Sequence, residues 1–576
     1  MNKWVRVNTR EGTVRVERGS DQELRWGGRN LIAKLLLLEV PPTCDPIGRY
    51  NKLIISEGLL GDTILATAGR LSIGGKSPLT GGAKESSVGG EAGRKLARLG
   101  FKAVIFEDAP EDLAPRVLFI SKKECRLLEM PELTHLAVSE TFRRLRERFG
   151  DEAGLMCIGP AGEMRLSAAA VAFQGEGGVQ VRLAGRGGLG AVLGAKGIKA
   201  VVFDDRGAKP AKVYDAKEMR EVSRDFARIL LKDPKTENRH NYGTPAVLSL
   251  CNELGILPTR NFSSGRFERA DEISGETIAN LIKTRGGEAR RGLPCIRGCV
   301  IRCANVFADA HGRKTVASIQ YENIALLGAN LNIGQIDDVA ELNHLCNEAG
   351  IDAIEAGASI GVAMEAGVLA FGDAEGAKNL LRQVGQGTPL GRIIGNGVCI
   401  TGKVFGARRV PAVKGQAIPA YDPRALKGIG VTYVTSPMGA DHTAGNALET
   451  AGALDPLGTH GQVEASRRLQ LRGAILDSLG LCLFVRPAFV KDPSLFGRML
   501  HARYGWDWSY KDIQNMGKEC LEDERKFNQM AGVSEDFFEI PEFMRDEPLP
   551  PRNTVFDLSL SEMKKIWDLP PLEDQF

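Results

Sequence analysis

The chain has 576 residues, 43% of them hydrophobic and 26% charged, which suggests three or four ordinary domains with ample apolar material for a core. Lysine and arginine total 75 against 72 acidic residues, and the net charge of +3 gives no reason to expect nucleic acid or an anionic membrane as a partner. The longest apolar run, 31–40, is interrupted by Lys34 and Glu39, so no membrane span is expected.

The cysteine content favours a reducing compartment. Eleven cysteines are scattered over the chain, and an odd number without regular spacing is a poor disulfide framework. The N-terminus alternates like a strand and shows no apolar core of a signal peptide. We therefore expect a cytoplasmic protein.

Residues 1–208 are predicted to be mainly β. Short alternating runs separated by glycine and proline turns predict strands at 3–7, 13–16, 52–56, 102–107, 116–120 and 200–203. Two helices are expected, near 90–99 and 140–149. No internal repeat of fixed period is visible.

From residue 209 the apolar spacing becomes helical. Helices are predicted at 215–231, 277–284, 337–350, 352–366, 374–384, 465–479 and 493–504. Ser559 to Glu562 is a capping box that opens a last short helix. The expected fold is α+β: a β-rich cofactor-binding domain at 1–208, followed by two mainly helical domains at 209–405 and 406–576.

Two segments of the β-rich part are rich in glycine and contain arginine. Residues 185–194 hold five glycines and Arg186, and residues 70–90 begin with Arg70. Glycines let backbone N–H groups approach phosphates, and arginine adds a bidentate fork. The alternative is that both are tight turns. A dinucleotide site is disfavoured, because 185–194 lacks a clean strand–turn–helix pattern with a ribose-binding acid.

Four cysteines have the pattern of a metal centre. Cys295, Cys299 and Cys303 recur every fourth residue, and Cys482 lies far downstream. Four thiolates are the usual ligands of a [4Fe–4S] cluster, but the same set could hold a structural zinc ion.

Taken together, these motifs resemble the aldehyde:ferredoxin oxidoreductase family of tungsten enzymes. The resemblance runs from about residue 3 to about 490, and its motifs are specific in combination. Besides the cysteines, it is carried by segments 76–82, 184–192, 320–322, 345–352, 438–443 and 477–482.

The resemblance implies two pyranopterin dithiolenes that hold tungsten or molybdenum, a magnesium ion bridging their phosphates, and a [4Fe–4S] cluster on the four cysteines. Its pterin motif is matched fully at 477–482 and with two departures at 347–352, where Asn347 replaces Asp and Ile351 replaces Leu. The implied cofactor-binding residues are Arg70, Ser87, Gly89, Arg186, Gly187, Gly188, Asn347, Gly350, Asp352, Asp477, Gly480, Leu481 and Cys482. Arg70 is also the expected bridge between cluster and pterin.

The resemblance also implies catalytic residues. Glu322 and His442 match the acid–base pair beside the metal. Glu341 and His344 match an E-x-x-H pair that links two subunits of the archaeal enzyme through a shared metal, which would imply a homodimer. The alternative, which we favour slightly, is an exposed helix pair without a ligand.

The implied function is oxidation of an aldehyde to a carboxylic acid, with electrons passed to ferredoxin or an iron–sulfur subunit. One alternative is the catalytic subunit of an aryl-CoA reductase. Another is a non-redox protein with a structural zinc site. The cysteine spacing, C-x3-C-x3-C, departs from the family's C-x2-C-x3-C and suggests a subfamily with its own substrate.

Overall fold

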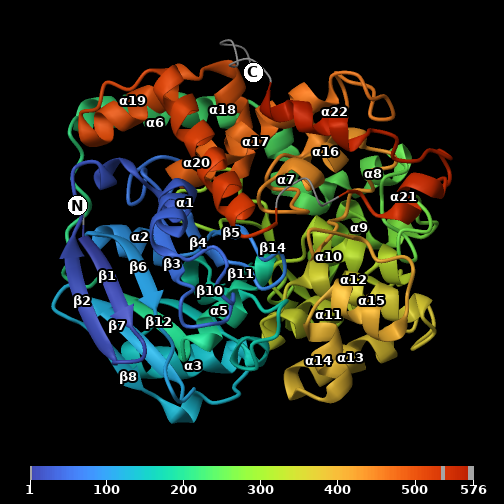
Figure 1. Ribbon diagram of the computed structural model, residues 1–576, viewed down its shortest axis with the longest axis horizontal. Helices are drawn as coiled ribbons and strands as arrows, with labels where there is room; N and C mark the ends of the chain where they lie inside the picture. The colour runs from blue at the N-terminus through green and yellow to red at the C-terminus, as the bar shows by residue number, and fades with distance from the viewer. Residues whose placement is uncertain (1–2, 534–538, 569–576) are drawn as a thin grey trace.

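The computed structural model describes residues 3–533 and 539–568. Its N-terminal part is built on two six-stranded sheets (Figure 1). The first has the strand order β2-β1-β6-β3-β4-β5, and its neighbours are antiparallel except for β1 and β6. Its strands are β1 (Lys3–Asn8), β2 (Thr13–Arg18), β3 (Leu53–Glu57), β4 (Leu71–Lys76), β5 (Ala83–Val88) and β6 (Phe101–Glu107).

The second sheet has the order β11-β10-β9-β12-β7-β8, and here β7 and β12 are the parallel neighbours. Its strands are β7 (Arg116–Ser121), β8 (Cys125–Glu129), β9 (Gly154–Ile158), β10 (Val171–Gln174), β11 (Val181–Ala184) and β12 (Ile198–Asp204). The helices of this part are α1 (Gly28–Glu39), α2 (Ala92–Arg98), α3 (Val138–Phe149), α4 (Pro160–Glu163) and α5 (Leu189–Ala195).

The two sheets repeat one topology. Each begins with a hairpin, continues through a helix into three antiparallel strands, and ends with a helix and a strand that pairs parallel with its first strand. The expectation of no repeat holds for sequence identity but not for structure, because different apolar residues can fill the same pleated positions. The repeat gives the protein two equivalent sheet edges, at β4–β5 and β10–β11.

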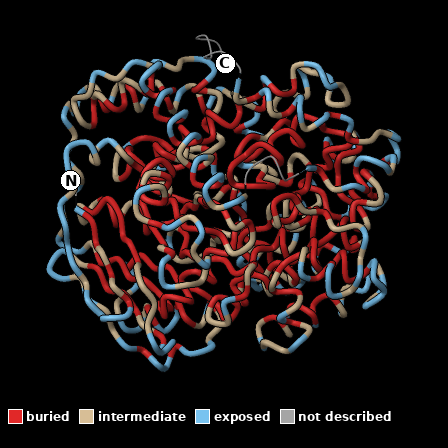
Figure 2. Tube along the Cα trace, viewed as in Figure 1, coloured by how far each residue is buried: buried red, intermediate tan, exposed pale blue. Residues whose placement is uncertain are grey.

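The two sheets share one buried core. Val104 of β6, Met156 of β9 and Val201 of β12 belong to a single cluster of buried side chains, together with Leu193 of α5. In Figure 2 the buried trace runs through these strands and the exposed trace lies at the periphery. The core fixes the positions of the loops that leave the sheets.

All six predicted strands are confirmed, as are the helices α2 and α3. The expectation that 185–194 lacks a strand–turn–helix is wrong: β11 leads through a 3-10 turn, Arg186–Gly188, into α5. The turn is possible because Gly187 and Gly188 have φ of 84° and 74°, which side chains other than glycine rarely adopt.

The rest of the chain is mainly helical, and the predicted α+β fold class is confirmed. The middle part contains α6 (Ala216–Leu231), α7 (Pro234–Tyr242), α8 (Leu248–Leu254), α9 (Gly275–Arg285), α10 (Tyr321–Leu326), α11 (Ile336–Ala349), α12 (Ala353–Glu365), α13 (Ala374–Gln386), α14 (Pro389–Gly395) and α15 (Val398–Phe405). Short strands accompany them: β13 (Arg290–Leu293), β14 (Ala304–Ala308), β15 (Lys314–Val316), β16 (Ala412–Val413) and β17 (Gln416–Ala417).

The C-terminal part contains α16 (Lys427–Thr435), α17 (Gln462–Leu479), α18 (Arg486–Lys491), α19 (Ser494–Tyr504), α20 (Tyr510–Met530), α21 (Glu542–Asp546) and α22 (Leu560–Lys564). All seven predicted helices are confirmed within a few residues, and the Ser559 capping box opens α22. None of the helices among the described residues has both the length and the hydropathy of a membrane span.

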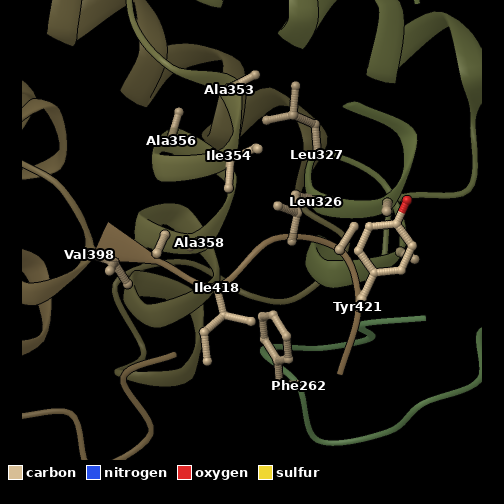
Figure 3. Close-up of a cluster of buried hydrophobic side chains, with 14 of the residues drawn as sticks. Phe262, Leu326, Leu327, Ala353, Ile354, Ala356, Ala358, Val398, Ile418 and Tyr421 are labelled. Atoms are coloured by element: carbon tan, nitrogen blue, oxygen red, sulfur yellow. The ribbon is translucent and has the colours of Figure 1, made fainter. Parts of the chain in front are cut away.

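Figure 1 shows how the parts meet. The blue and cyan sheets lie at the lower left, the yellow helices at the lower right, and the orange and red helices across the top. The α12 helix is buried in the middle part, where Ile354 and Ala358 lie near Leu326 and Ile418 (Figure 3). Tyr421, also in Figure 3, belongs to this core and to the wall of the cavity described next.

Candidate active site and metal centre

One cavity of about 530 Å³ is lined by residues from all three parts of the chain. This volume is in the range of cofactor and substrate sites. The predicted site residues that line it are Arg70, Ser87, Gly89, Arg186, Cys295, Cys303, Glu322, Asn347, Asp352, His442, Asp477 and Cys482. The predicted residues that do not line it are Gly187, Gly188, Cys299, Glu341, His344, Gly350, Gly480 and Leu481.

The motifs 347–352 and 477–482 occupy equivalent places. Each lies at the C-terminal end of a helix, α11 or α17, and each helix is capped by a left-handed glycine, Gly350 or Gly480. A β-bridge from Ala169 to Ile351 joins the first motif to the second sheet, and a bridge from Ala68 to Leu481 joins the other to the first sheet. The repeated sheets thus hold one motif each.

The two motif glycines act through the backbone. A Cβ on Gly58 would lie 2.1 Å from the Gly480 nitrogen, and a Cβ on Gly159 would lie 2.4 Å from the Ala349 oxygen. The backbone N–H of Arg70 donates to the Gly480 oxygen at 3.1 Å. Gly58 and Gly159 therefore allow the helix ends at Gly480 and Gly350 to approach the sheets closely. The cofactor contact predicted for Gly350 and Gly480 stays a prediction.

Arg70 connects one motif with the cysteines. Its guanidinium donates to the Ser87 hydroxyl at 2.9 Å and to the Ser87 carbonyl at 2.8 Å. Burial would lower the pKa of Arg70, but the negative potential of Cys482 and Cys295 leaves it raised. Gly89 lies against the same thiol, since a Cβ there would be 3.0 Å from the Cys295 sulfur. The structure brings Arg70, Ser87, Gly89 and the cysteines together.

Arg186 occupies the equivalent place beside the other motif. Its Nη2 donates to the Ala417 carbonyl at 2.7 Å, and its Nε lies 3.3 Å from the Asp352 carboxylate. Its buried Nη1 and the Oδ2 of Asp352 have no hydrogen-bond partner among the described residues. Gly187 and Gly188 pack against Lys84 and Ser167, where a Cβ would come within 2.3 and 2.2 Å, so they let the turn close.

The four cysteines gather at one side of the cavity, and all four are free thiols. A hydrogen bond between Cys295 and Cys299 lowers the pKa of Cys295 to about 5 and raises that of Cys299. Burial raises the pKa of Cys303 to about 12. Among residues 3–533 and 539–568, no three His, Cys, Asp or Glu side chains converge on a point that would hold a single metal ion. Four thiolates are the ligand set of a [4Fe–4S] cluster and also of a structural zinc ion, so metal analysis has to separate the two.

Glu322 and His442, 120 positions apart in the chain, are in contact. The His442 Nε2 lies 3.3 Å from the Glu322 Oε1, and the Glu322 Oε2 accepts from the Ala420 N–H at 2.9 Å. Burial raises the pKa of Glu322, and His442 opposes this shift. The ring of Tyr421 lies 5.7 Å from that of His442. A carboxylate with a raised pKa beside an imidazole can accept and return a proton near neutral pH.

Glu341 and His344 lie on α11 away from the cavity. Glu341 forms ion pairs with Lys378 at 2.9 Å and Arg382 at 2.8 Å, so its carboxylate is already engaged. This arrangement gives no support to a metal shared between subunits, which stays a prediction.

The cavity has further polar residues that the sequence analysis did not single out. Glu85 of β5 is 3% exposed, its Oε1 has no described partner, and burial beside Asp477 raises its pKa well above the usual range. Lys84 forms a buried ion pair with Asp441. Glu85 lies in the glycine-rich segment 70–90, and Asp441 lies in the family segment 438–443. Membership of these segments was the only sequence signal for either residue. Other polar lining residues include Arg182, Arg239, Tyr421 and Arg486.

Comparisons with known proteins agree with this geometry. The family described as "Aldehyde ferredoxin oxidoreductase, N-terminal domain" matches residues 4–205, and "Aldehyde ferredoxin oxidoreductase, domains 2 & 3" matches residues 221–567. A tungsten-containing aldehyde ferredoxin oxidoreductase of Pyrococcus abyssi is 33% identical, covering 95% of this chain and 92% of the relative. The Pyrococcus furiosus protein of the same description is 31% identical with the same coverage.

More distant similarities share the architecture. A WOR-like subunit of an aliphatic sulfonate oxidoreductase from Pyrococcus furiosus is 26% identical over 84% of this chain and 79% of its own length. The solved active-site complex BamBC of benzoyl coenzyme A reductase, with 1,5-dienoyl-CoA, superposes with a TM-score of 0.78. It is 19% identical and covers 98% of this chain and 93% of that chain, which shows a common fold.

Proposed function

The chain belongs to the aldehyde ferredoxin oxidoreductase family, and we propose that it oxidises an aldehyde to a carboxylic acid. The balanced half-reaction is R–CHO + H₂O → R–COOH + 2 H⁺ + 2 e⁻. The observation that supports it best is the contact of Glu322 with His442 in the same cavity as both helix-end motifs and the cysteines. The electrons would pass to ferredoxin or to an iron–sulfur subunit in the cytoplasm.

The residues present fit the family's cofactors. Arg186 and Asp352 line the cavity, and the buried Arg186 Nη1 and Asp352 Oδ2 have no hydrogen-bond partner among the described residues, so a bound group could supply one. Arg70 and Arg186 would hold the pterin phosphates, whose oxygens would in turn bind the magnesium ion, and Asn347 and Asp477 would hold the pterin amines. When bound, the tungsten pyranopterin would supply Lewis acidity and accept electrons, and the [4Fe–4S] cluster would carry them away singly.

The proton chemistry is assigned to the protein. Glu322 would take a proton from the water or the hydrated aldehyde, because burial favours its protonated form once the proton has moved. His442, 3.3 Å away, would orient this carboxylate and donate a hydrogen bond to the substrate oxygen. The apolar core behind Tyr421 would exclude bulk water from that side.

A substrate screen tests this function. Anaerobically prepared protein, analysed for tungsten, molybdenum, iron and zinc, would be assayed with aldehydes and with aryl-CoA thioesters, using a viologen dye as acceptor or donor. We expect aldehyde-dependent dye reduction, tungsten near one per chain and about four irons. Turnover of the thioesters alone would favour the aryl-CoA reductase alternative. Stoichiometric zinc with no iron would favour the structural zinc site.

Glu85 offers a prediction about cofactor binding. We expect Glu85→Gln to lower pterin and tungsten content several-fold, because Glu85 lines the cavity with an unpaired Oε1 that can pair with a pterin group, and the amide presents a different pattern of donors and acceptors. Pterin released from the purified protein would be measured by its fluorescence after oxidation.

The matched control for this prediction is Glu57→Gln. Glu57 is a buried acid of the same sheet with a raised pKa of about 7 and an unpaired oxygen, but it does not line the cavity. We expect normal pterin content in that variant. Equal pterin content in both variants would show that Glu85 serves the sheet and not the cofactor.

A further inference from the structure

The segment that holds three of the cysteines is unusually cationic on its surface. Residues 290–303 contain four arginines and no acidic residue, although the net charge of the whole chain is only +3. Arg290, Arg291, Arg297 and Arg302 are all exposed. We call these four residues the arginine face.

The fold keeps the arginine face together. Strand β13 pairs antiparallel with β14, so that Leu293 lies opposite Ala304 and Arg290 opposite Val306. The Arg302 Nε donates to the Gly292 carbonyl at 2.8 Å, which ties the end of the cysteine segment back to its beginning. Cys295 and Cys299 therefore lie in a loop that this hydrogen bond closes and that also carries Arg297, while Arg290 and Arg291 lie on the strand that leads into it.

Among the described residues, these four arginines lack the ion pairs that several other exposed arginines of the protein form. Arg143, Arg269 and Arg313 each form an ion pair with a carboxylate three or four residues away. None of the four residues of the arginine face pairs with an acidic side chain in the described part of the chain. An unneutralised group of like charges costs stability through repulsion, so its presence needs an explanation other than folding.

The arginine face lies beside three of the cysteines, and Arg297, Gly298 and Arg302 of the cysteine segment are exposed. Cys299 is 9% exposed and Cys303 is half-buried. Gly298, between them and exposed, has only the Leu65 carbonyl, at 4.0 Å, near its Cβ position. Electron transfer weakens steeply with distance, so a carrier that takes electrons from these thiols' cluster must approach this loop.

We propose that the arginine face docks an acidic electron-carrier protein that accepts one electron at a time. This rests on the proposed function, which leaves two electrons per aldehyde. The balanced reaction is R–CHO + H₂O + 2 carrier(ox) → R–COOH + 2 H⁺ + 2 carrier(red), so each turnover needs two docking events. Opposite charges bring the carrier's cluster over Gly298 and raise the association rate.

Charge-reversal variants test the proposal through binding as well as rate. Arg297→Glu/Arg302→Glu changes the cysteine loop, and Arg290→Glu/Arg291→Glu changes β13 outside the cysteines. Lys122→Glu/Lys123→Glu, on an exposed turn of the second sheet, is a control with the same change in charge. The Kd for an acidic bacterial-type ferredoxin would be measured calorimetrically at 50 and 500 mM salt.

We expect both arginine variants to weaken ferredoxin binding by about tenfold or more at low salt, with the control within about twofold, because steering effects of this kind span 10–10³-fold. High salt should remove the difference, since charges are screened within about 3–10 Å at such ionic strengths. The rate of aldehyde-dependent reduction of benzyl viologen, a small cationic dye, should not change in Arg290→Glu/Arg291→Glu.

Two results would overturn the proposal: native ferredoxin affinity in Arg290→Glu/Arg291→Glu, or affinity that high salt leaves unchanged in the unmodified protein. If Arg297→Glu/Arg302→Glu loses iron, the ferredoxin affinity of Arg290→Glu/Arg291→Glu alone decides the proposal. A protein that binds ferredoxin through the arginine face but reduces no dye with any aldehyde would instead contradict the proposed function, so the two failures can be told apart.

Discussion

We expect Glu322→Gln to lower kcat by about 10²–10⁴-fold, or roughly 3–5 kcal/mol of barrier, while tungsten, iron and pterin contents stay at the native level. The amide keeps the size of the side chain and can still accept from the Ala420 N–H, but it cannot take a proton. The measurement is steady-state turnover of the best aldehyde with viologen as acceptor, on protein analysed for metals.

The pH profile distinguishes a catalytic from a structural role. A general base works only when deprotonated, so the native rate should fall as the pH drops through the pKa of Glu322. Because burial raises that pKa, the fall should come at a higher pH than the value of about 4.3 for a free glutamate. In Glu322→Gln this limb should disappear, whereas a merely structural substitution would keep it.

His442 gives a graded comparison. His442→Gln should lower kcat less than Glu322→Gln does, because the amide N–H and water can replace part of the hydrogen-bond donation of the imidazole. If Glu322→Gln carries its metals and turns over at the native rate, Glu322 is not the base. If it loses its metals, the carboxylate helps to hold the cofactor and the kinetic comparison must be made with another variant that keeps them.

The pattern of apolar residues predicted the helices and strands in which burial follows one rule along the whole element. Strands β6 and β12 are buried along almost their whole length, and α11 carries its buried residues at helical spacing, so these elements follow from their apolar residues. Strand β5 was not predicted, because its sequence, AKESSV, looks exposed. Lys84 is buried there only because Asp441, 357 residues later, neutralises it. A partner so distant in sequence leaves no local signal.

The candidate site, like the fold, was only partly predictable from the sequence. The cysteine spacing and the glycine-rich segments could be found from the residues alone, but the meeting of Glu322 and His442 could not, since neither residue is unusual in its own segment. Only the order of motifs shared with the family placed them together, and the structure brings them to 3.3 Å. The equivalence of Gly58 with Gly159 was invisible, because the repeated sheets share topology and not sequence.

The equivalence of the two sheets and their helix ends has one functional consequence. Both helix ends are held by a sheet, but only the end at Asp477 lies beside the cysteines, because Cys482 belongs to the same motif. Arg70 interacts with both Asp477 and the cysteines. Arg186, at the other motif, contacts Asp352 instead. The duplicated scaffold therefore presents two equivalent helix ends, of which one lies beside the cysteines, and we expect only a cofactor at that end to exchange electrons directly with the cluster.

Removal of a cluster cysteine should have the other large effect. We expect Cys295→Ser, Cys299→Ser, Cys303→Ser and Cys482→Ser each to lose most of the iron and the EPR signal of a reduced [4Fe–4S] cluster, because the cluster needs a thiolate at each iron. Electron transfer to ferredoxin should fall to background. The measurements are iron per chain and EPR spectra of dithionite-reduced protein.

The matched control is Cys399→Ser. Cys399 is half-buried, as are Cys303 and Cys482, but it does not line the cavity, so the substitution should leave the iron content unchanged. Native iron content in all four cluster variants would exclude these cysteines as ligands. Loss of iron in three variants but not in Cys299→Ser would point to another ligand at that position, since Cys299 alone of the four does not line the cavity. Compared with C-x2-C-x3-C, the chain has one extra residue between Cys295 and Cys299, so the Cys295→Ser and Cys299→Ser variants test the altered spacing most directly.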